Sequence, residues 1–222
     1  MRSGFHKELG TLQEDILKMG NLVHELIYKA VKSMVNKDVE MAREVIKADD
    51  IVDEMASRLE ERCLSMIARQ QPMAKDLRMI AGALHLAMDL ERIADHAEGL
   101  ANITIRLKDQ AYIKPLIDIP RMGELAREML KKALKAILRD DVANAWSLVE
   151  DEKVMDAIYK QIFRELLSIM MEDPRTITQA TELLLAAGHL ERIADHITNV
   201  GEMVLYIAEG RRVDLNKIAR TS

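Results

Sequence analysis

Aromatic residues, glycine and proline are all scarce in this sequence. It has two Phe, one Trp, four Tyr, nine Gly and four Pro among 222 residues. Sheets favour aromatic side chains and need turns rich in Gly, Pro and Asn, so this composition disfavours a β protein. The residues that favour helices, among them Ala, Leu, Met, Glu, Lys and Arg, are abundant. The composition therefore predicts an all-α protein.

Cysteine and long hydrophobic runs are also lacking. Cys63 is the only cysteine, which excludes an intramolecular disulfide and fits a reducing compartment. It shares a helical apolar stripe with Leu59 and Met66, so we expect a buried thiol. The apolar run 183–187 is far too short to span a bilayer, and the first ten residues lack the apolar region of a signal peptide. We expect a soluble protein that reaches a membrane only through partners.

Neither an excess of positive charge nor a catalytic motif is present. Asp and Glu number 37 against 32 Lys and Arg, for a net charge of −5. Proteins that bind nucleic acid are usually basic, so no nucleic-acid partner is expected. The sequence has no Gly-rich phosphate loop, no HExxH and no GxSxG motif. None of its six His has Glu three residues earlier, as a di-iron oxidase would need. These absences predict a protein that is not an enzyme.

The chain contains an internal repeat. The segment Leu90–His96 recurs unchanged as Leu190–His196, at an offset of 100 residues. Upstream, residues 18–39 align with 121–142 at an offset of 103, with nine identities. Such self-similarity is typical of a duplicated structural unit. We predict a first three-helix repeat at 1–112, a second at 113–210 and a basic tail at 211–222.

Apolar residues three and four positions apart predict three helices in each unit. The first stripe comprises Leu9, Leu12, Ile16, Met19, Val23, Leu26, Ala30 and Val31, and the third begins with Leu77, Ile80 and Leu84. The expected helices run to about 36–38, from there to before Pro72, from near 72–76 to about 109, and over about 120–140, 141–172 and 174–209. Asp173 and Pro174 are suited to capping and starting the last one. Short connections make neighbours antiparallel, which predicts two tandem antiparallel three-helix bundles related by duplication.

Four acidic pairs recur in matching places of the two units. Each pair is spaced four residues apart and so shares one helix face, at a cost of ~0.2–0.5 kcal/mol for like charges. One such pair alone would indicate only a solvated helix face. Four pairs kept by the repeat call for a compensating charge. The pairs are Asp49 and Asp53, Glu91 and Asp95, Glu152 and Asp156, and Glu191 and Asp195.

The acidic pairs flank the apolar stripes of the second and third helices of each unit. If those helices are neighbours, four carboxylates converge in each bundle, with further acidity from Asp50, Glu150 and Asp151. Carboxylate oxygens without thiolates suit hard cations. A salt-bridged face neutralised by Arg92, Arg192 or nearby Lys explains the spacing equally well. Residues and spacing leave both interpretations open.

Two other features carry weaker signals. His96 and His196 follow the repeated Asp residues but lie one step round the helix, so we expect them to form hydrogen bonds between helices or behind a metal rather than to be ligands. The basic tail beyond residue 210 is only weakly periodic, and we expect it to fray or to make a minor contact.

The repeat, the acidic pairs and the ERIADH signature together resemble the PhoU family. The resemblance covers about residues 5–209. Besides the two ERIADH copies, it rests on AREVIKADDIVDEM at 42–55, QPMAKDLRMIAGAL at 71–84 and MMEDPRTITQATELLLAAGHL at 170–190. The two copies of the signature in a chain of this length make the match specific.

The resemblance implies a cytoplasmic negative regulator of phosphate uptake and phosphate homeostasis. Such a regulator acts with the phosphate ABC transporter and a phosphate-responsive sensor histidine kinase, and often forms a homodimer. It also implies multinuclear metal clusters, with Fe or Zn as the leading ions and Mg or Mn as further candidates. The implied metal ligands are Asp49, Asp53, Glu91, Asp95, Glu152, Asp156, Glu191 and Asp195, and all eight positions hold a carboxylate.

Three functions compete at this point. The first is a metal-dependent signalling adaptor between the transporter and the kinase. The second is a metal-free helical scaffold that binds partners through its acidic faces. The third, disfavoured by the missing motifs, is a carboxylate-bridged metalloenzyme.

Overall fold

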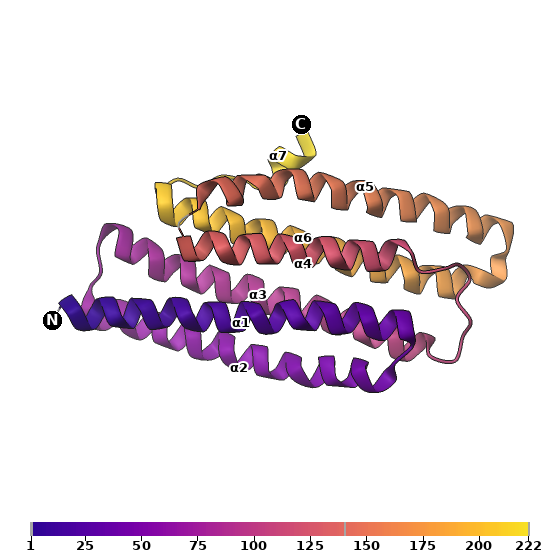
Figure 1. The fold of residues 1–222 in the computed structure, drawn as a ribbon, viewed down its shortest axis with the longest axis horizontal. Helices are drawn as coiled ribbons and strands as arrows, with labels where there is room; N and C mark the ends of the chain where they lie inside the picture. Colours follow the sequence, from indigo (N-terminus) through magenta and orange to yellow (C-terminus); the bar gives the residue numbers. More distant parts are fainter. Residues whose placement is uncertain (1, 140, 222) are drawn as a thin grey trace.

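Helices form every secondary-structure element of the part of the chain that the structure, a computed structural model, describes: residues 2–139 and 141–221. The elements are α1 (Arg2–Asn36), α2 (Val39–Gln70), α3 (Ala74–Leu107), α4 (Asp118–Arg139), α5 (Val142–Glu172), the 3₁₀ turn η1 (Pro174–Thr176), α6 (Ile177–Glu209) and α7 (Leu215–Thr221). Figure 1 shows α1–α3 as one bundle and α4–α6 as another, with these long helices side by side. The predicted all-α architecture of two tandem three-helix bundles is confirmed.

Polar caps begin the helices at matching places of the two repeats. The side chains of Asp38 and Asp141 each accept a hydrogen bond from the backbone N–H three residues on, at 2.9 and 3.1 Å. Asp173 caps η1 with Pro174 in its first turn, as the sequence predicts. Gly210 ends α6 in the left-handed region at φ 74°, where glycine carries no steric penalty. These caps satisfy backbone groups that a helix end leaves unpaired.

The predicted apolar stripes form the core. All eight stripe residues of α1 are buried, and the Cys63 thiol on α2 is fully buried. On α3 the stripe begins one turn later than expected: Leu77 is 40% exposed, whereas Ile80 is fully buried. Leu77 lies in the first turn of α3, close to the exposed connection from α2. The periodicity is therefore right for the helix as a whole and wrong at its start.

The two bundles pack closely against each other through α3 and α6. These helices run antiparallel, with Gly99 against His189 and Gly82 against Ile207. A Cβ at Gly99 would lie 2.3 Å from the His189 ring, so only glycine allows this approach. α1 and α4 pack against each other as well. The bundles thus share one core, and α3 and α6 are buried on the sides that face both.

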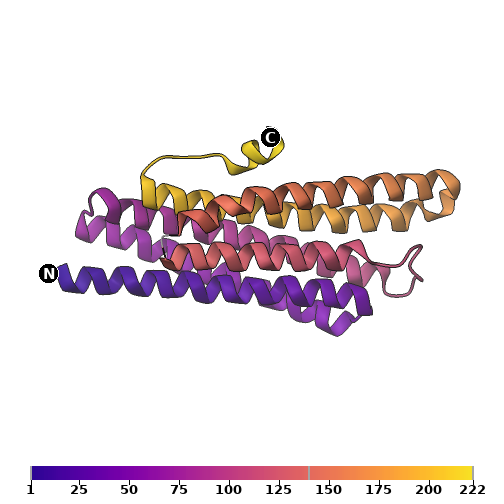
Figure 2. The same cartoon turned by 45° about the horizontal axis from the view of Figure 1, so that its top comes forward.

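The tail forms a helix, which the sequence did not predict. α7 packs against α5 and α6, and its Leu215 is fully buried. Leu215 lies near Gly201 on α6, where a Cβ would come within 2.6 Å of the Leu148 side chain of α5. Figure 2 shows the extended segment after α6 that carries α7 back along the second bundle. One buried leucine is too short a signal for periodicity to detect.

Candidate metal centres

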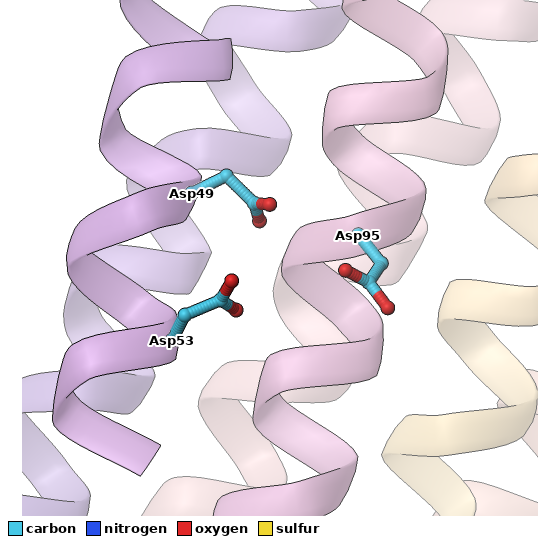
Figure 3. Close-up of side chains that lie close together, drawn as sticks. All are labelled: Asp49, Asp53 and Asp95. Carbon is cyan, nitrogen blue, oxygen red and sulfur yellow. The ribbon is translucent and has the colours of Figure 1, made fainter. Parts of the chain in front are cut away.

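The first acidic cluster lies between α2 and α3. Asp49 and Asp53 are one turn apart on α2, and Asp95 faces them from α3 (Figure 3). One carboxylate oxygen from each lies within 4.8 Å of the others. Asp49 is only 8% exposed, and its Oδ1 is buried without a hydrogen-bond partner. An anionic oxygen buried in this way favours either a proton or a bound cation.

Burial and like charge act together on Asp49. Burial, followed by the charges of Asp53, Glu98, Asp95 and Asp50 in that order, raises its pKa to about 7. Arg92 forms an ion pair with Asp95 at 3.1 Å, but its side chain is 58% exposed. An exposed ion pair of this kind contributes little. The first cluster therefore keeps a surplus of negative charge once its carboxyl groups ionise.

Glu91 lies beside this cluster rather than inside it. The group whose oxygens lie within 4.8 Å of one another consists of Asp49, Asp53 and Asp95 and does not include Glu91. Burial raises the pKa of Glu91, Arg92 opposes the shift, and the charges of Asp95 and Asp53 add to it. Glu91 thus lies close enough for the charges of Asp95 and Asp53 to raise its pKa. The shared helix face of Glu91 and Asp95 predicts this proximity.

The second cluster occupies the matching place between α5 and α6. Glu152 is 1% exposed, and neither of its carboxylate oxygens has a hydrogen-bond partner. Burial raises its pKa to about 8, and Asp195, Asp156 and Glu191 contribute in that order. Burial also raises the pKa values of Glu191 and Asp195. The four predicted residues are therefore close enough to interact in this repeat too.

Basic side chains reach both clusters, one in the first, where Arg92 pairs with Asp95, and two in the second. Lys160 lies 3.2 Å from Asp156, and Arg220 of α7 lies 2.9 Å from Asp195. Within residues 2–139 and 141–221, the first cluster alone gathers three potential ligand atoms within 4.8 Å. The two clusters thus have carboxylates at matching positions but differ in the basic side chains that pair with them.

Comparison with known proteins identifies the relatives of this fold. The PhoU domain family matches residues 16–104 and 119–204, once for each bundle. The chain belongs to the PhoU family. It is 36% identical to a phosphate-specific transport system accessory protein PhoU homolog of Clostridium acetobutylicum, over 97% of this chain and 99% of the relative. It is 41% identical to the homolog of Aquifex aeolicus, over 93% of this chain and 94% of the relative.

Solved PhoU structures have the same fold. The crystal structure of PhoU from Pseudomonas aeruginosa superposes with a TM-score of 0.90 at 35% identity, covering 93% of this chain and all of the other. The phosphate transport system regulatory protein PhoU from Streptococcus pneumoniae gives a TM-score of 0.88 at 32% identity, over 95% and 99% of the two chains. The family resemblance inferred from the ERIADH repeats is thereby confirmed.

The sequence prediction missed some residues at the two acidic clusters. Glu98 raises the pKa of Asp49, and it could have been found, because Glu91, Asp95 and Glu98 follow the i, i+4, i+7 spacing of one helix face. Its counterpart in the second repeat is Thr198, so the repeat itself hid it. Arg220 gave no sequence signal, because it reaches its cluster only through the fold of α7.

Two further acidic residues on α5, Glu150 and Asp151, form ion pairs with lysines. Glu150 pairs with Lys153 at 2.9 Å, and Asp151 pairs with Lys132 at 2.6 Å. For these two the salt-bridged interpretation is right. Asp50, in contrast, is exposed on α2 and adds to the field at Asp49.

The repeated histidines join the two PhoU repeats across α3 and α6. His96 Nδ1 lies 3.2 Å from His189 Nδ1, and His196 Nδ1 lies 3.0 Å from Asp89 Oδ1. Asn199 also donates to Asp89, at 3.1 Å. Burial lowers the pKa of His96 to about 4, which keeps its ring neutral. The prediction of helix-to-helix hydrogen bonds for His96 and His196 is confirmed. The potential ligands of the acidic clusters are therefore carboxylate oxygens.

Proposed function

We propose that this PhoU-family chain is a metal-binding negative regulator of phosphate uptake. The observation that carries the regulatory role is its similarity, over nearly its whole length, to relatives named phosphate-specific transport system accessory proteins. The proposed role is regulatory and involves no catalysis. It is that of an adaptor between the phosphate ABC transporter and a sensor histidine kinase.

Metal binding is supported by the donor set of the two clusters. Asp49 and Glu152 are buried carboxylates with oxygens that lack a partner, and each is surrounded by further carboxylates. Such oxygen-rich sites suit hard or borderline cations, so Fe or Zn, or else Mg or Mn, fits the residues present. A bound cation would supply the positive charge that ionised Asp49 and Glu152 otherwise lack. The eight predicted carboxylates remain the proposed ligands.

Metal binding would control the charge of the surface that partners contact. With the carboxylates ionised and no cation bound, α2 and α3 present a strongly acidic strip, which repels acidic partners. Neutralising that strip would let an acidic face of the transporter or the kinase approach. No helix in the described ranges is long and apolar enough to cross a bilayer. We propose a cytoplasmic homodimer that meets the membrane through its partners.

Capture from membranes tests the adaptor proposal. Membranes from cells that make the phosphate transporter and its sensor kinase are incubated with tagged protein, with and without chelator. We expect the transporter ATPase subunit and the kinase to be captured only without chelator. We expect a variant with Asp53, Asp95, Asp156 and Asp195 changed to Asn to lose this capture because it lacks four of the charges that hold the cation.

A control variant removes carboxylates that lie outside the proposed ligand set. Asp50→Asn with Glu54→Gln removes two carboxylates of the same helix that are both exposed, and it should leave capture unchanged. Capture that persists in chelator would support the metal-free scaffold instead. Failure to recover either named partner under any condition would refute the adaptor role.

A further inference from the structure

Sequence differences between the repeats make the two carboxylate clusters unequal. In the first repeat, Glu98 adds a fifth carboxylate close to Asp49. In the second repeat the matching position is Thr198, which contacts α7 instead. The position that matches Lys160 is Ser57, so the first repeat also lacks that cation. Both differences follow from sequence changes inside an otherwise repeated unit.

α7 is anchored beside the second cluster through polar and apolar contacts. The Leu215 side chain is buried, and its backbone N–H donates to Glu202 at 2.7 Å. Asn216 accepts from Thr198 and donates to the backbone carbonyl of Asp195 at 3.3 Å. Asn216 also donates to the Asn199 side chain at 3.2 Å. These contacts place the last turn of α7 over the proposed ligand Asp195.

Arg220 joins the second cluster from that last turn. Its Nη2 donates to Asp195 Oδ1 at 2.9 Å. Its charge also opposes the upward pKa shifts of Glu152 and Glu191, so it acts on the whole cluster. The Arg220 side chain is 55% exposed, about as much as Arg92 at the first cluster, but Arg92 pairs with Asp95 within α3, whereas Arg220 belongs to a separate segment and can leave with it. A guanidinium in this position contributes the charge that a metal ion would otherwise contribute.

We propose that α7 is a tethered cationic competitor for metal at the second cluster. Metal then fills the first cluster at lower concentration, and filling the second requires Arg220 to leave Asp195. Two cations within a few ångströms repel each other, so the guanidinium and the metal cannot share this carboxylate at low energy. α7 has seven residues and fully buries only Leu215, and its polar contacts can be exchanged for water, so it opens at lower cost than the long helices. This inference rests on the proposed metal binding and adds an order of filling and a released segment.

Manganese titration of a simplified protein tests this competition. Asp53→Asn and Asp95→Asn are introduced first to remove Mn²⁺ binding at the first cluster, so that the titration measures binding at the second cluster. We expect Arg220→Ala to tighten Mn²⁺ binding there about threefold to tenfold, the range of a partly exposed charge-assisted pair. Lys217→Ala removes the same charge from the same helix at an exposed position and should leave the affinity unchanged.

Hydrogen exchange supplies a second readout that does not depend on affinity. Saturating Mn²⁺ should speed amide exchange across residues 215–221 in the protein with both clusters intact. Equal affinities for the Arg220→Ala and Lys217→Ala proteins, or slower exchange in α7 with Mn²⁺, would overturn the competition. In that case Mn²⁺ binding itself would still stand. No Mn²⁺ binding in any variant would refute metal binding and the competition together.

Discussion

Glu152→Gln is expected to stabilise the metal-free protein by about 3 kcal/mol near pH 9 and to have little effect near pH 5. Glu152 is 1% exposed, and burial, followed by the charges of Asp195 and Asp156, raises its pKa from 4.5 to about 8. Between these two values the unfolded chain has lost the proton and the folded chain still holds it. The free energy of unfolding therefore falls as pH rises through this window, and the loss persists above pH 8.

Urea unfolding in chelator, at about pH 5 and about pH 9, measures this effect. Each unit by which the folded pKa exceeds the unfolded one is worth about 1.4 kcal/mol, and relaxation around the charge lowers the sum to about 3 kcal/mol. Glu150→Gln is the matched control, because Glu150 lies two residues away on α5, is exposed and pairs with Lys153. It should change stability little at either pH. A loss of stability in Glu152→Gln that is equal at both pH values would show that the carboxylate has a stabilising partner.

Changing Asp49, Asp53 and Asp95 together to Asn is expected to weaken Mn²⁺ binding at the first cluster by about 100-fold or more. Loss of groups that merely support metal ligands already costs about 10–100-fold, and here three ligand charges disappear. Amide oxygens can still face a cation, but they cannot balance its charge. Isothermal titration with Mn²⁺ measures the change.

The control for this triple variant uses the same helix and the same spacing. Asp50 and Glu54 are also four residues apart on α2, but both are exposed and Glu54 pairs with Arg58 at 2.5 Å. Asp50→Asn with Glu54→Gln should keep the affinity within about threefold. If both variants lose affinity equally, the effect comes from the overall field of α2 and not from a site. If the triple variant keeps its affinity, the ion binds elsewhere.

Much of the fold could be predicted because apolar periodicity and capping residues agree. The stripe of α1 is long enough that eight buried residues reinforce one interpretation, and Asp173 with Pro174 marks the turn into the last long helix. The duplication adds a second, independent reading of each helix. The facing of α2 and α3, and hence the approach of Asp53 to Asp95, follows from short antiparallel connections.

What could not be predicted depends on contacts between distant segments. α3 packs closely on α6 where Gly99 lies against the His189 ring, and no local sequence pattern predicts this contact. α7 packs against α5 and α6 through buried Leu215, a contact that the sequence of the tail alone does not indicate. Arg220 therefore reaches Asp195 through tertiary structure alone. The repeat indicated the eight matching carboxylates but not Glu98, because the matching position in the second repeat is Thr198.

Anomalous X-ray diffraction from crystals grown with Mn²⁺ tests the central claim most directly, which is that neighbouring helices of each repeat hold cations between their carboxylates. One anomalous peak is expected between α2 and α3, within about 2.5 Å of carboxylate oxygens of Asp49, Asp53 and Asp95. At higher Mn²⁺ a second peak is expected between α5 and α6, beside Glu152. Peaks found only on other surfaces, with both clusters free of anomalous signal at saturating Mn²⁺, would contradict it.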